Sequence, residues 1–285
     1  MEFEEIRRLV VISMFADDVL MHRLVLKGGN ALNLVHRIGN RTTLDVDLSL
    51  EDDFEDLEDA EGRLLRGLAD RFDSAGYALF DGRLVSRPAN LAGRPPTWGG
   101  YRVEFKLIAK EHAQRLDDLD ALRRRAEVVG PAQQRTFNVE ISKYEYCAPK
   151  EETEFEGYTI YVYPPALIAA EKLRAICQQM PEYELVRNKR ARARDFYDIY
   201  CIVTERELDM GSSEFLELVK HTFAAKDVPL ELIPRIPEHR EFHRPDWVSV
   251  VQSVSQDLEE YDVYFDWLVE EIRRLHTLWD EQAPL

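Results

Sequence analysis

The sequence has little cysteine and no long apolar run. Its three cysteines are far apart and odd in number, so they offer neither a disulfide framework nor metal-ligand spacing, and we expect buried free thiols at Cys147, Cys177 and Cys201. No apolar stretch approaches the length of a membrane span, and the first residues carry acids where a secretory signal has a basic region. These absences predict a cytoplasmic protein with no membrane partner.

A positive net charge is also missing. The 54 acidic and 37 basic residues leave a net charge of -17, which argues against a surface that binds nucleic acid everywhere, because phosphate contacts need cations. The charge is uneven, since residues 51–61 hold eight acids and residues 187–194, RNKRARAR, hold five basic side chains. The acidic run is typical of a solvated loop and helix start. The basic run is either an exposed helix start or a local phosphate-binding patch.

The chain has enough apolar residues, 45% of the total, to fold as a globular protein of 285 residues, with two domains or one large domain and an appendage. Helical periodicity and turn signals predict helices at 2–22, 31–37 (with Asn30 as N-cap), 57–74, 118–130, 165–179, 189–204, 213–224, 246–259 and 261–280. Alternation predicts strands at 44–48, 77–80, 83–86, 101–108, 136–143 and 158–163. The fold class is therefore α+β, with an α+β domain at 1–163 and a helical domain at 164–285.

Two carboxylates follow each other at a period of two in the stretch 24–50. If residues 44–48 form a strand, Thr43, Asp45 and Asp47 point to one face, and the two carboxylates lie about 6.6 Å apart. Such a pair suits a divalent cation. Glu104 and Glu140 occupy other alternating segments, and either could supply a third carboxylate.

A glycine pair, Gly28-Gly29, precedes this strand at a predicted helix start. Glycine lets backbone N–H groups approach a triphosphate, and a helix N-terminus favours the anion. An isolated glycine pair is more often a simple turn. The P-loop motif G-x-x-x-x-G-K-[ST] does not occur in the sequence.

Two predicted helices carry a charge on an apolar face. Lys172 lies in an apolar arc of the helix at 165–179, and Asp195 does so at 189–204, with Asp198 near the edge of that face. A buried charge must be paired or must reach a polar cleft. The alternatives without function are a snorkelling lysine stem and a structural ion pair.

Together these features resemble the AbiEii/AbiGii toxin family of nucleotidyltransferases, which includes toxins of type IV toxin–antitoxin systems. The matching motifs occur in the family's order between residues 27 and 200, namely Lys27-Gly28-Gly29, RTTLDVD at 41–47, EKLRA at 171–175 and RDFYDIY at 194–200. The family commonly has serine at the position of Thr43. This departure is mild, because both side chains carry a hydroxyl group.

The resemblance implies a polymerase-β-like nucleotidyltransferase core with a helical C-terminal domain, and nucleotide transfer from an NTP with Mg²⁺ or Mn²⁺. It implies that Asp45, Asp47 and Glu140 hold the metal, with Glu140 fitting the family's later acidic strand better than Glu104, although both remain open. Phosphate-binding residues would be Lys27, Gly28, Gly29, Arg41 and Thr43. Lys172 would neutralise charge on the phosphates, and Asp195 would orient Lys172 or act on the acceptor hydroxyl, in a cleft between the two domains.

Some members of this family act on tRNA 3′ ends, which would block translation. The resemblance therefore implies a growth-arresting toxin with a tRNA acceptor, RNKRARAR as a tRNA contact, and a cognate antitoxin encoded nearby. The acidic net charge would suit transfer to a small molecule or a protein better. A catalytically silent nucleotide-binding module is the alternative outside enzymes.

Overall fold

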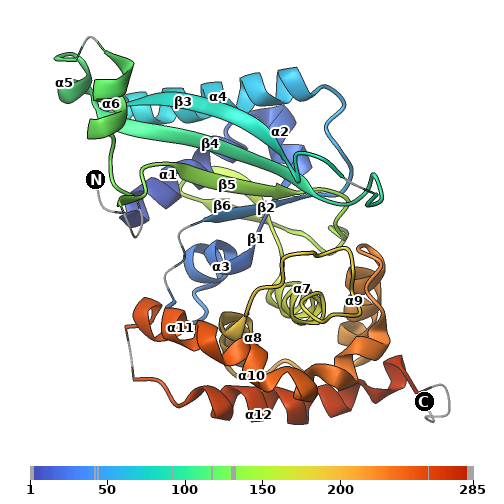
Figure 1. Cartoon of the computed structure of the whole chain (residues 1–285). Helices are drawn as coiled ribbons and strands as arrows, with labels where there is room; N and C mark the ends of the chain where they lie inside the picture. The colour runs from blue at the N-terminus through green and yellow to red at the C-terminus, as the bar shows by residue number, and fades with distance from the viewer. Residues whose placement is uncertain are drawn as a thin grey trace. The chain divides into compact units, whose positions relative to one another are not determined.

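The chain folds into two compact units. A computed structural model describes residues 3–41, 43, 45–91, 93–116, 118–129, 133–255 and 257–280 (Figure 1). Unit 1 comprises residues 1–30 and 43–162, and unit 2 comprises residues 31–42 and 163–285. The last division falls next to the domain boundary expected at residue 163. Residues 31–42, however, belong to the helical unit, although they were expected in the first domain.

Unit 1 is built on a seven-stranded mixed sheet with the strand order β3-β4-β5-β2-β1-β7-β6 (Figure 1). The strands are β1 Leu24–Lys27, β2 Val46–Leu50, β3 Tyr77–Arg87, β4 Gly100–Ala109, β5 Phe137–Ser142, β6 Glu151–Phe155 and β7 Tyr158–Val162. Strand β2 pairs with β5 in parallel and with β1 antiparallel. With the helices described below, this mixed sheet confirms the α+β class.

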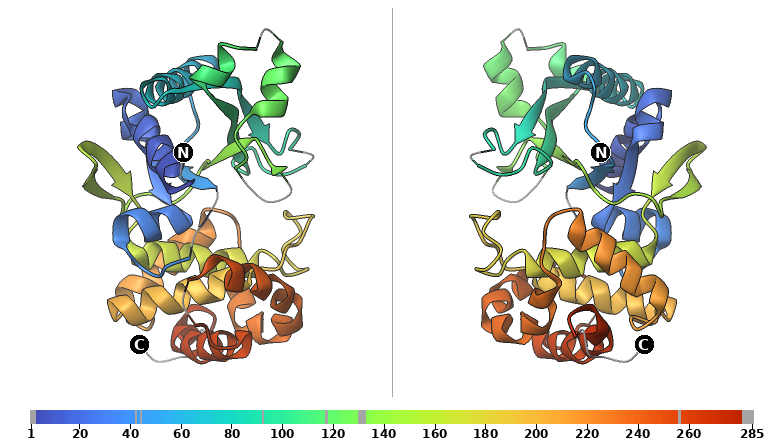
Figure 2. Two further views of the ribbon diagram at one scale, coloured as in Figure 1. Left: turned by 90° about the vertical axis from the view of Figure 1, so that its left-hand side faces the viewer. Right: turned by 90° about the vertical axis from the view of Figure 1, so that its right-hand side faces the viewer.

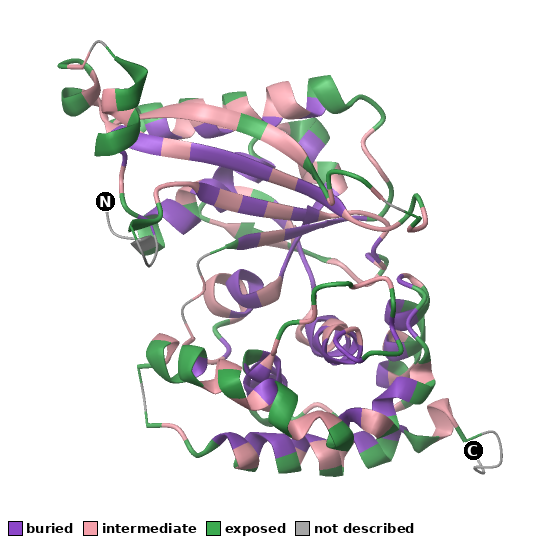
Figure 3. Cartoon of the chain, in the orientation of Figure 1, coloured by how far each residue is buried: buried purple, intermediate pink, exposed green. Residues whose placement is uncertain are grey.

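One face of this sheet forms the core of unit 1. The helices of the unit are α1 Phe3–Phe15, α2 Asp18–Arg23, α3 Gly28–Asn30, α4 Leu57–Ser74, α5 Lys110–Ala113 and α6 Leu119–Arg125. Helices α1 and α4 pack together on one side of the sheet (Figure 2). Val46, Leu48, Val139 and Ile141 are buried there, whereas the residues between them are more exposed, as the alternating bands on β5 show (Figure 3). The other face is thus left to polar side chains.

Unit 2 is helical, as the sequence predicted. Its longer helices are α7 Pro165–Cys177, α8 Ala193–Arg206, α9 Ser213–Ala224, α11 Trp247–Ser253 and α12 Tyr261–Glu271. Its shorter elements are the π-helix η1 Ala31–His36, the 3-10 helices η3 Leu230–His239, η4 Arg244–Asp246 and η5 Ile272–Leu278, and helix α10 Arg240–His243. Helix α7 packs against both α8 and α9 (Figure 1). All three cysteines are free and buried, as expected.

Several predicted elements were wrong in their ends or their type. The helix expected at 2–22 breaks after Phe15, because the Asp17 carboxylate accepts hydrogen bonds from the N–H groups of Val19 and Leu20 and starts α2. The turn expected at Asp81-Gly82 is an irregularity within the single long strand β3, where Asp81 has φ +51°. The highly charged strand β6 was missed, since its sequence EETEF carries no apolar alternation.

Other predicted elements are shorter than expected. Helix α8 begins at Ala193 rather than at 189, α6 covers only Leu119–Arg125, and α11 ends at Ser253. The last predicted helix changes to 3-10 geometry after Glu271. Residues 2, 42, 44, 130 and 256, on which predictions also fell, lie outside the described residues. No helix among the described residues is long and apolar enough to cross a membrane.

Candidate functional site

The glycine pair, Gly28-Gly29, forms a tight turn at the start of α3, beside strand β2, which carries Asp47. Strand β1 ends at Lys27, and Gly28 has φ +66°, in the left-handed region that favours glycine. A Cβ atom at Gly28 would lie 2.7 Å from Oδ2 of Asp47. The turn therefore brings backbone into close contact with this carboxylate, which no larger residue would allow without a shift.

The segment that enters β2 is fixed by two buried side chains. Asn30 Nδ2 donates a hydrogen bond to the carbonyl oxygen of Asp45 at 2.6 Å, and Arg7 Nη1 donates one to the carbonyl oxygen of Thr43 at 3.1 Å. Asp45 itself is exposed and lies just before the strand. The N-cap expected at Asn30 was wrong, because the helix already begins at Gly28. Asn30 instead positions Asp45.

Asp47 and Glu140 are direct neighbours on parallel strands. In the register of β2 and β5, Asp47 pairs with Glu140, so their side chains project from the same face of the sheet. Burial raises the pKa of Glu140 above its ordinary value, the Arg102 guanidinium opposes this, and the negative charge of Asp45 adds to the rise. Arg102 Nε donates a hydrogen bond to Oε1 of Glu140 at 2.6 Å. Strand register thus places Asp47 beside Glu140, and the charge of Asp45 acts on Glu140 as well.

Glu104, the other acid considered, has a different setting. It lies on β4, paired with Asn138, and its carboxylate accepts hydrogen bonds from Arg83 at 2.9 and 2.6 Å and from Arg87 at 2.9 Å. Burial would raise the pKa of Glu104, but these two guanidinium groups lower it below its ordinary value. Of the two acids, Glu140 is therefore the one beside Asp47.

The donor set at this edge fits a hard divalent cation. Carboxylate oxygens are the ligands that Mg²⁺ prefers, and Mg²⁺ commonly takes only one or two of them and completes its shell with waters and substrate phosphates. The described residues contain no group of three or more His, Cys, Asp or Glu side chains arranged to enclose a metal ion. Asp45 and Asp47, with Glu140 beside them, would hold such a cation. Its positive charge would favour the ionised form of Glu140, whose pKa is raised mainly by burial and further by the charge of Asp45.

Lys27 has a protein partner in the structure. Its ammonium is buried and lies 3.6 Å from Oε1 of Glu145, whose side chain is buried as well. Strand register also places Lys27 opposite Asp47. The phosphate-binding role expected for Lys27 stays a prediction, and it would require the ammonium to leave Glu145 or to serve both groups.

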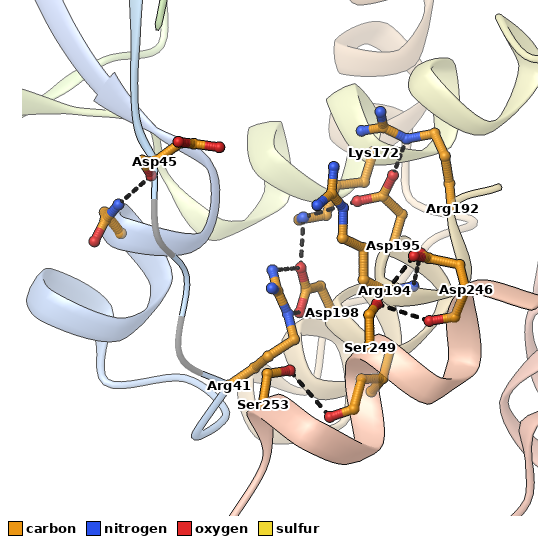
Figure 4. A network of polar contacts seen from close by, with 12 residues as sticks. Arg41, Asp45, Lys172, Arg192, Arg194, Asp195, Asp198, Asp246, Ser249 and Ser253 are labelled. Atoms are coloured by element: carbon orange, nitrogen blue, oxygen red, sulfur yellow. Dashed lines mark hydrogen bonds and ion pairs between the residues drawn. The ribbon is translucent and has the colours of Figure 1, made fainter. Parts of the chain in front are cut away.

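A network of charged side chains lies inside unit 2 (Figure 4). The Lys172 ammonium of α7 lies 3.1 Å from Oδ1 of Asp195 and 2.6 Å from Oδ2 of Asp198, both on α8. Arg41 donates two hydrogen bonds to Asp198, at 3.0 and 2.9 Å, and Arg192 pairs with Asp195. Lys172 is thus held by two carboxylates, each of which has a second cationic partner.

The two aspartates of this network remain ionised despite their burial. Burial alone would raise the pKa of Asp195, but the charges of Arg192 and Lys172 outweigh it and lower that pKa. The charges of Arg41 and Lys172 likewise lower the pKa of Asp198 against the effect of burial. Lys172 and Asp195 are therefore paired inside unit 2. The alternative, in which the lysine stem extends along the core and its ammonium reaches solvent, is wrong.

Sequence reasoning missed how Arg41 and Asp198 act in this network. Arg41 was expected to bind phosphate, and in the structure its guanidinium pairs with Asp198, within the same unit as residues 31–42. A signal for Asp198 was present, because residues three apart, such as Asp195 and Asp198, share one side of a helix. The joint action of Lys172 and Asp195 with Asp45 and Asp47 stays a prediction.

Part of the basic run RNKRARAR also has structural partners. Lys189 Nζ donates hydrogen bonds to the carbonyl oxygens of Gln178, at 3.0 Å, and Tyr183. Arg192 pairs with Asp195, whereas Arg190 and Arg194 are exposed. Most of the run precedes α8 rather than forming its first turns. Its use as an RNA contact stays a prediction.

Comparison with known proteins gives one family match. The family model described as "Nucleotidyl transferase AbiEii toxin, Type IV TA system" matches residues 11–271. No curated protein matches the sequence. Similar solved structures include JHP933 from Helicobacter pylori, at 17% identity and a TM-score of 0.49 over 98% of this chain and 92% of that one. Another is an antigenic nucleotidyltransferase-like protein from Paracoccidioides brasiliensis, at 16% identity and a TM-score of 0.36 over 88% and 94%.

Proposed function

Because the chain belongs to the nucleotidyl transferase AbiEii toxin family of type IV toxin–antitoxin systems, we propose that it moves a nucleotide from an NTP to an RNA acceptor with the help of a divalent cation. The proposed acceptor is the 3′ end of tRNA, whose modification would block translation and arrest growth. Membership in this family implies a cognate antitoxin as a partner. The family resemblance drawn from four short motifs is confirmed, since the match covers residues 11–271.

The observation that carries the proposal is the pairing of Asp47 with Glu140 beside the Gly28 turn. The turn places backbone against the Asp47 carboxylate, so a triphosphate bound at the turn would lie next to these acids. A bound Mg²⁺ would neutralise negative charge on the transferred phosphate and on the departing pyrophosphate. Asp45, Asp47 and Glu140 would hold that ion, and Asn30 would keep Asp45 in place through its carbonyl oxygen.

For Asp195, the network in unit 2 favours a positioning role over a role as general base. A general base works best when its pKa lies near the working pH, whereas the pKa of Asp195 is lowered and both carboxylate oxygens have cationic partners. We therefore propose that Asp195 and Asp198 orient the Lys172 ammonium. Lys172 would then neutralise phosphate charge with a fixed geometry.

The test compares Asp47→Asn with Glu51→Gln, which changes an exposed acid directly after the other end of the same strand. Each purified protein is incubated with total RNA, Mg²⁺ and each labelled NTP in turn. We expect Asp47→Asn to lower labelling of RNA by about 100-fold or more, because the lost charge acts on the transition state, and Glu51→Gln to leave it unchanged. Equal labelling by the wild type and Asp47→Asn would refute the proposed metal site.

The same incubation with a whole-cell extract in place of total RNA separates the other possible acceptors. The net charge of -17 favours a protein or a small molecule over RNA as acceptor. Label that appears in protein or in a small product, and not in RNA, would replace the RNA acceptor and keep the transferase activity. Tight NTP binding without transfer to any cellular fraction would instead indicate a nucleotide-binding module without catalysis.

A further inference from the structure

Three arginines converge on one buried carboxylate on the polar face of the sheet in unit 1. Arg83 and Arg87 of β3 and Arg102 of β4, here called the arginine patch, surround Glu104. Arg83 donates two hydrogen bonds to Oε2, at 2.9 and 2.6 Å, and Arg87 donates one to Oε1 at 2.9 Å. Arg102 lies 3.8 Å from the same Oε1 and also binds Glu140. Glu104 thus gathers three guanidinium groups at one place.

The arginine patch stays accessible although its anchor is buried. The side chains of Arg83, Arg87 and Arg102 are 66%, 46% and 28% exposed, whereas that of Glu104 is 10% exposed. A guanidinium has five N–H donors, and these contacts occupy only some of them. The three guanidinium groups outnumber the two carboxylates that they contact, Glu104 and Glu140, in a chain whose net charge is -17. A surface of this kind suits phosphate, which the planar guanidinium binds through paired hydrogen bonds.

Strand register places the arginine patch on one side of the acid pair and the glycine turn on the other. Along the sheet, Arg102 of β4 pairs with Glu140 of β5, Glu140 pairs with Asp47 of β2, and Asp47 pairs with Lys27 of β1, just before the turn. Strand β4 lies two strands from β2, about 10 Å away, while β1 is the next strand on the other side. A triphosphate bound at the turn would therefore leave the arginine patch free for a second ligand on the opposite side of Asp47 and Glu140.

We propose that the arginine patch binds backbone phosphates of the acceptor RNA near the end that receives the nucleotide. This inference rests on the proposed function and adds to it the surface that holds the acceptor. RNA could then bind a chain with a net charge of -17, because it would contact a local cluster of cations that a buried carboxylate holds in place. Glu104, which the sequence left open as a metal ligand, would then hold the arginines that bind the acceptor.

The experiment measures binding of a fluorescently labelled tRNA to the full chain as a function of salt. The variant Arg83→Gln/Arg87→Gln removes two exposed cations and keeps Arg102 on Glu140. The control, Arg124→Gln/Arg125→Gln, removes the same charge from exposed positions of α6. We expect the patch variant to bind at least about 10-fold more weakly and to lose about 0.7 to 0.9 from the salt slope for each phosphate contact removed. The control should bind as the wild type does.

Each alternative result has a defined reading. Equal weakening by both variants, or no binding of tRNA by the wild type, would overturn the proposal. A parallel loss of affinity for the NTP alone would assign the arginine patch to the triphosphate and would overturn it too. Absent nucleotide transfer by the wild type, with patch-dependent tRNA binding intact, would count against the proposed function alone. If the double variant unfolds, Arg83→Gln, which leaves two arginines around Glu104, should still weaken binding several-fold, and unchanged binding would refute the proposal.

Discussion

At the scale of single residues, Gly28 is a position in the candidate site of unit 1 that strongly favours glycine. Gly28 combines a positive φ of +66° with a position where a Cβ atom would lie 2.7 Å from the Asp47 carboxylate. Gly76 also has a positive φ, +86°, but a Cβ atom there would meet nothing within 4 Å. An alanine at Gly76 would thus cause backbone strain alone, whereas an alanine at Gly28 would cause backbone strain and also displace Asp47.

Gly28→Ala should lower both stability and nucleotide transfer. The left-handed backbone costs a residue with a side chain about 1–2 kcal/mol, and Asp47 must also move away from the added methyl group. Gly76→Ala should show only the cost in unfolding free energy. Urea unfolding and initial rates of RNA labelling measure the two effects. Full activity in Gly28→Ala would show that the turn does not set the position of Asp47.

At the scale of secondary-structure elements, helices α7 and α8 are joined by buried charges. Lys172 lies between Asp195 and Asp198, and replacing it by an apolar residue would leave both carboxylates with one cationic partner fewer. Breaking a buried ion pair from one side commonly costs about 3–5 kcal/mol. We expect Lys172→Met to lower the urea midpoint by a corresponding amount. Asp198→Asn should cost less, since Asp195 still pairs with Lys172. An unchanged midpoint in Lys172→Met would show that the network adds nothing to stability.

The same two carboxylates predict how stability depends on pH. The pKa values of Asp195 and Asp198 are lower in the folded chain than their ordinary value of 3.8. Groups with a depressed pKa stabilise the fold above the unfolded pKa, and this contribution is lost as the pH falls through the folded pKa. Unfolding free energy should therefore fall below about pH 4, and less steeply in Asp195→Asn than in the wild type. Parallel pH profiles of the two proteins would contradict this.

At the scale of the whole molecule, neither unit is one continuous stretch of chain. Residues 31–42 lie between two segments of unit 1 but belong to unit 2, where Arg41 pairs with Asp198. His36 Nε2 also lies 2.7 Å from the carbonyl oxygen of Tyr163. A fragment that begins at residue 163, the boundary expected from the sequence, would thus lack residues 31–42 of unit 2.

A fragment of residues 163–285 should therefore be less stable than the same residues in the full chain. It lacks Arg41, whose charged hydrogen bonds to Asp198 contribute about 1.5–3 kcal/mol. Arg41→Met in the full chain is the matched control, and it should reproduce part of the loss. Urea unfolding followed by circular dichroism measures both. A fragment as stable as the full chain would show that residues 31–42 are not needed by unit 2.

The sequence by itself determined the class of the elements and the family. Local periodicity depends on residues close together in the chain, which is why α4 and α9 were predicted with their observed ends, 57–74 and 213–224. The same patterns exposed Lys172 and Asp195 as charges on apolar faces. The start of α2 at its N-cap Asp17 and the continuation of β3 through Asp81 were not predicted. Both depend on hydrogen bonds that form only in the folded chain.

The tertiary structure alone decided which side chains meet. Parallel pairing of β2 with β5 set Glu140 beside Asp47, although the two residues lie far apart in the sequence. Pairing of β3 with β4 assigned Glu104 to the arginine patch. The segment after η1 brought Arg41 to Asp198 on α8, and the segment before β2 brought the carbonyl oxygen of Asp45 to Asn30. A sequence pattern specifies which face a residue occupies, because that follows from the local geometry of helix or strand. It does not specify the partner across the face, because that depends on register and packing between distant segments.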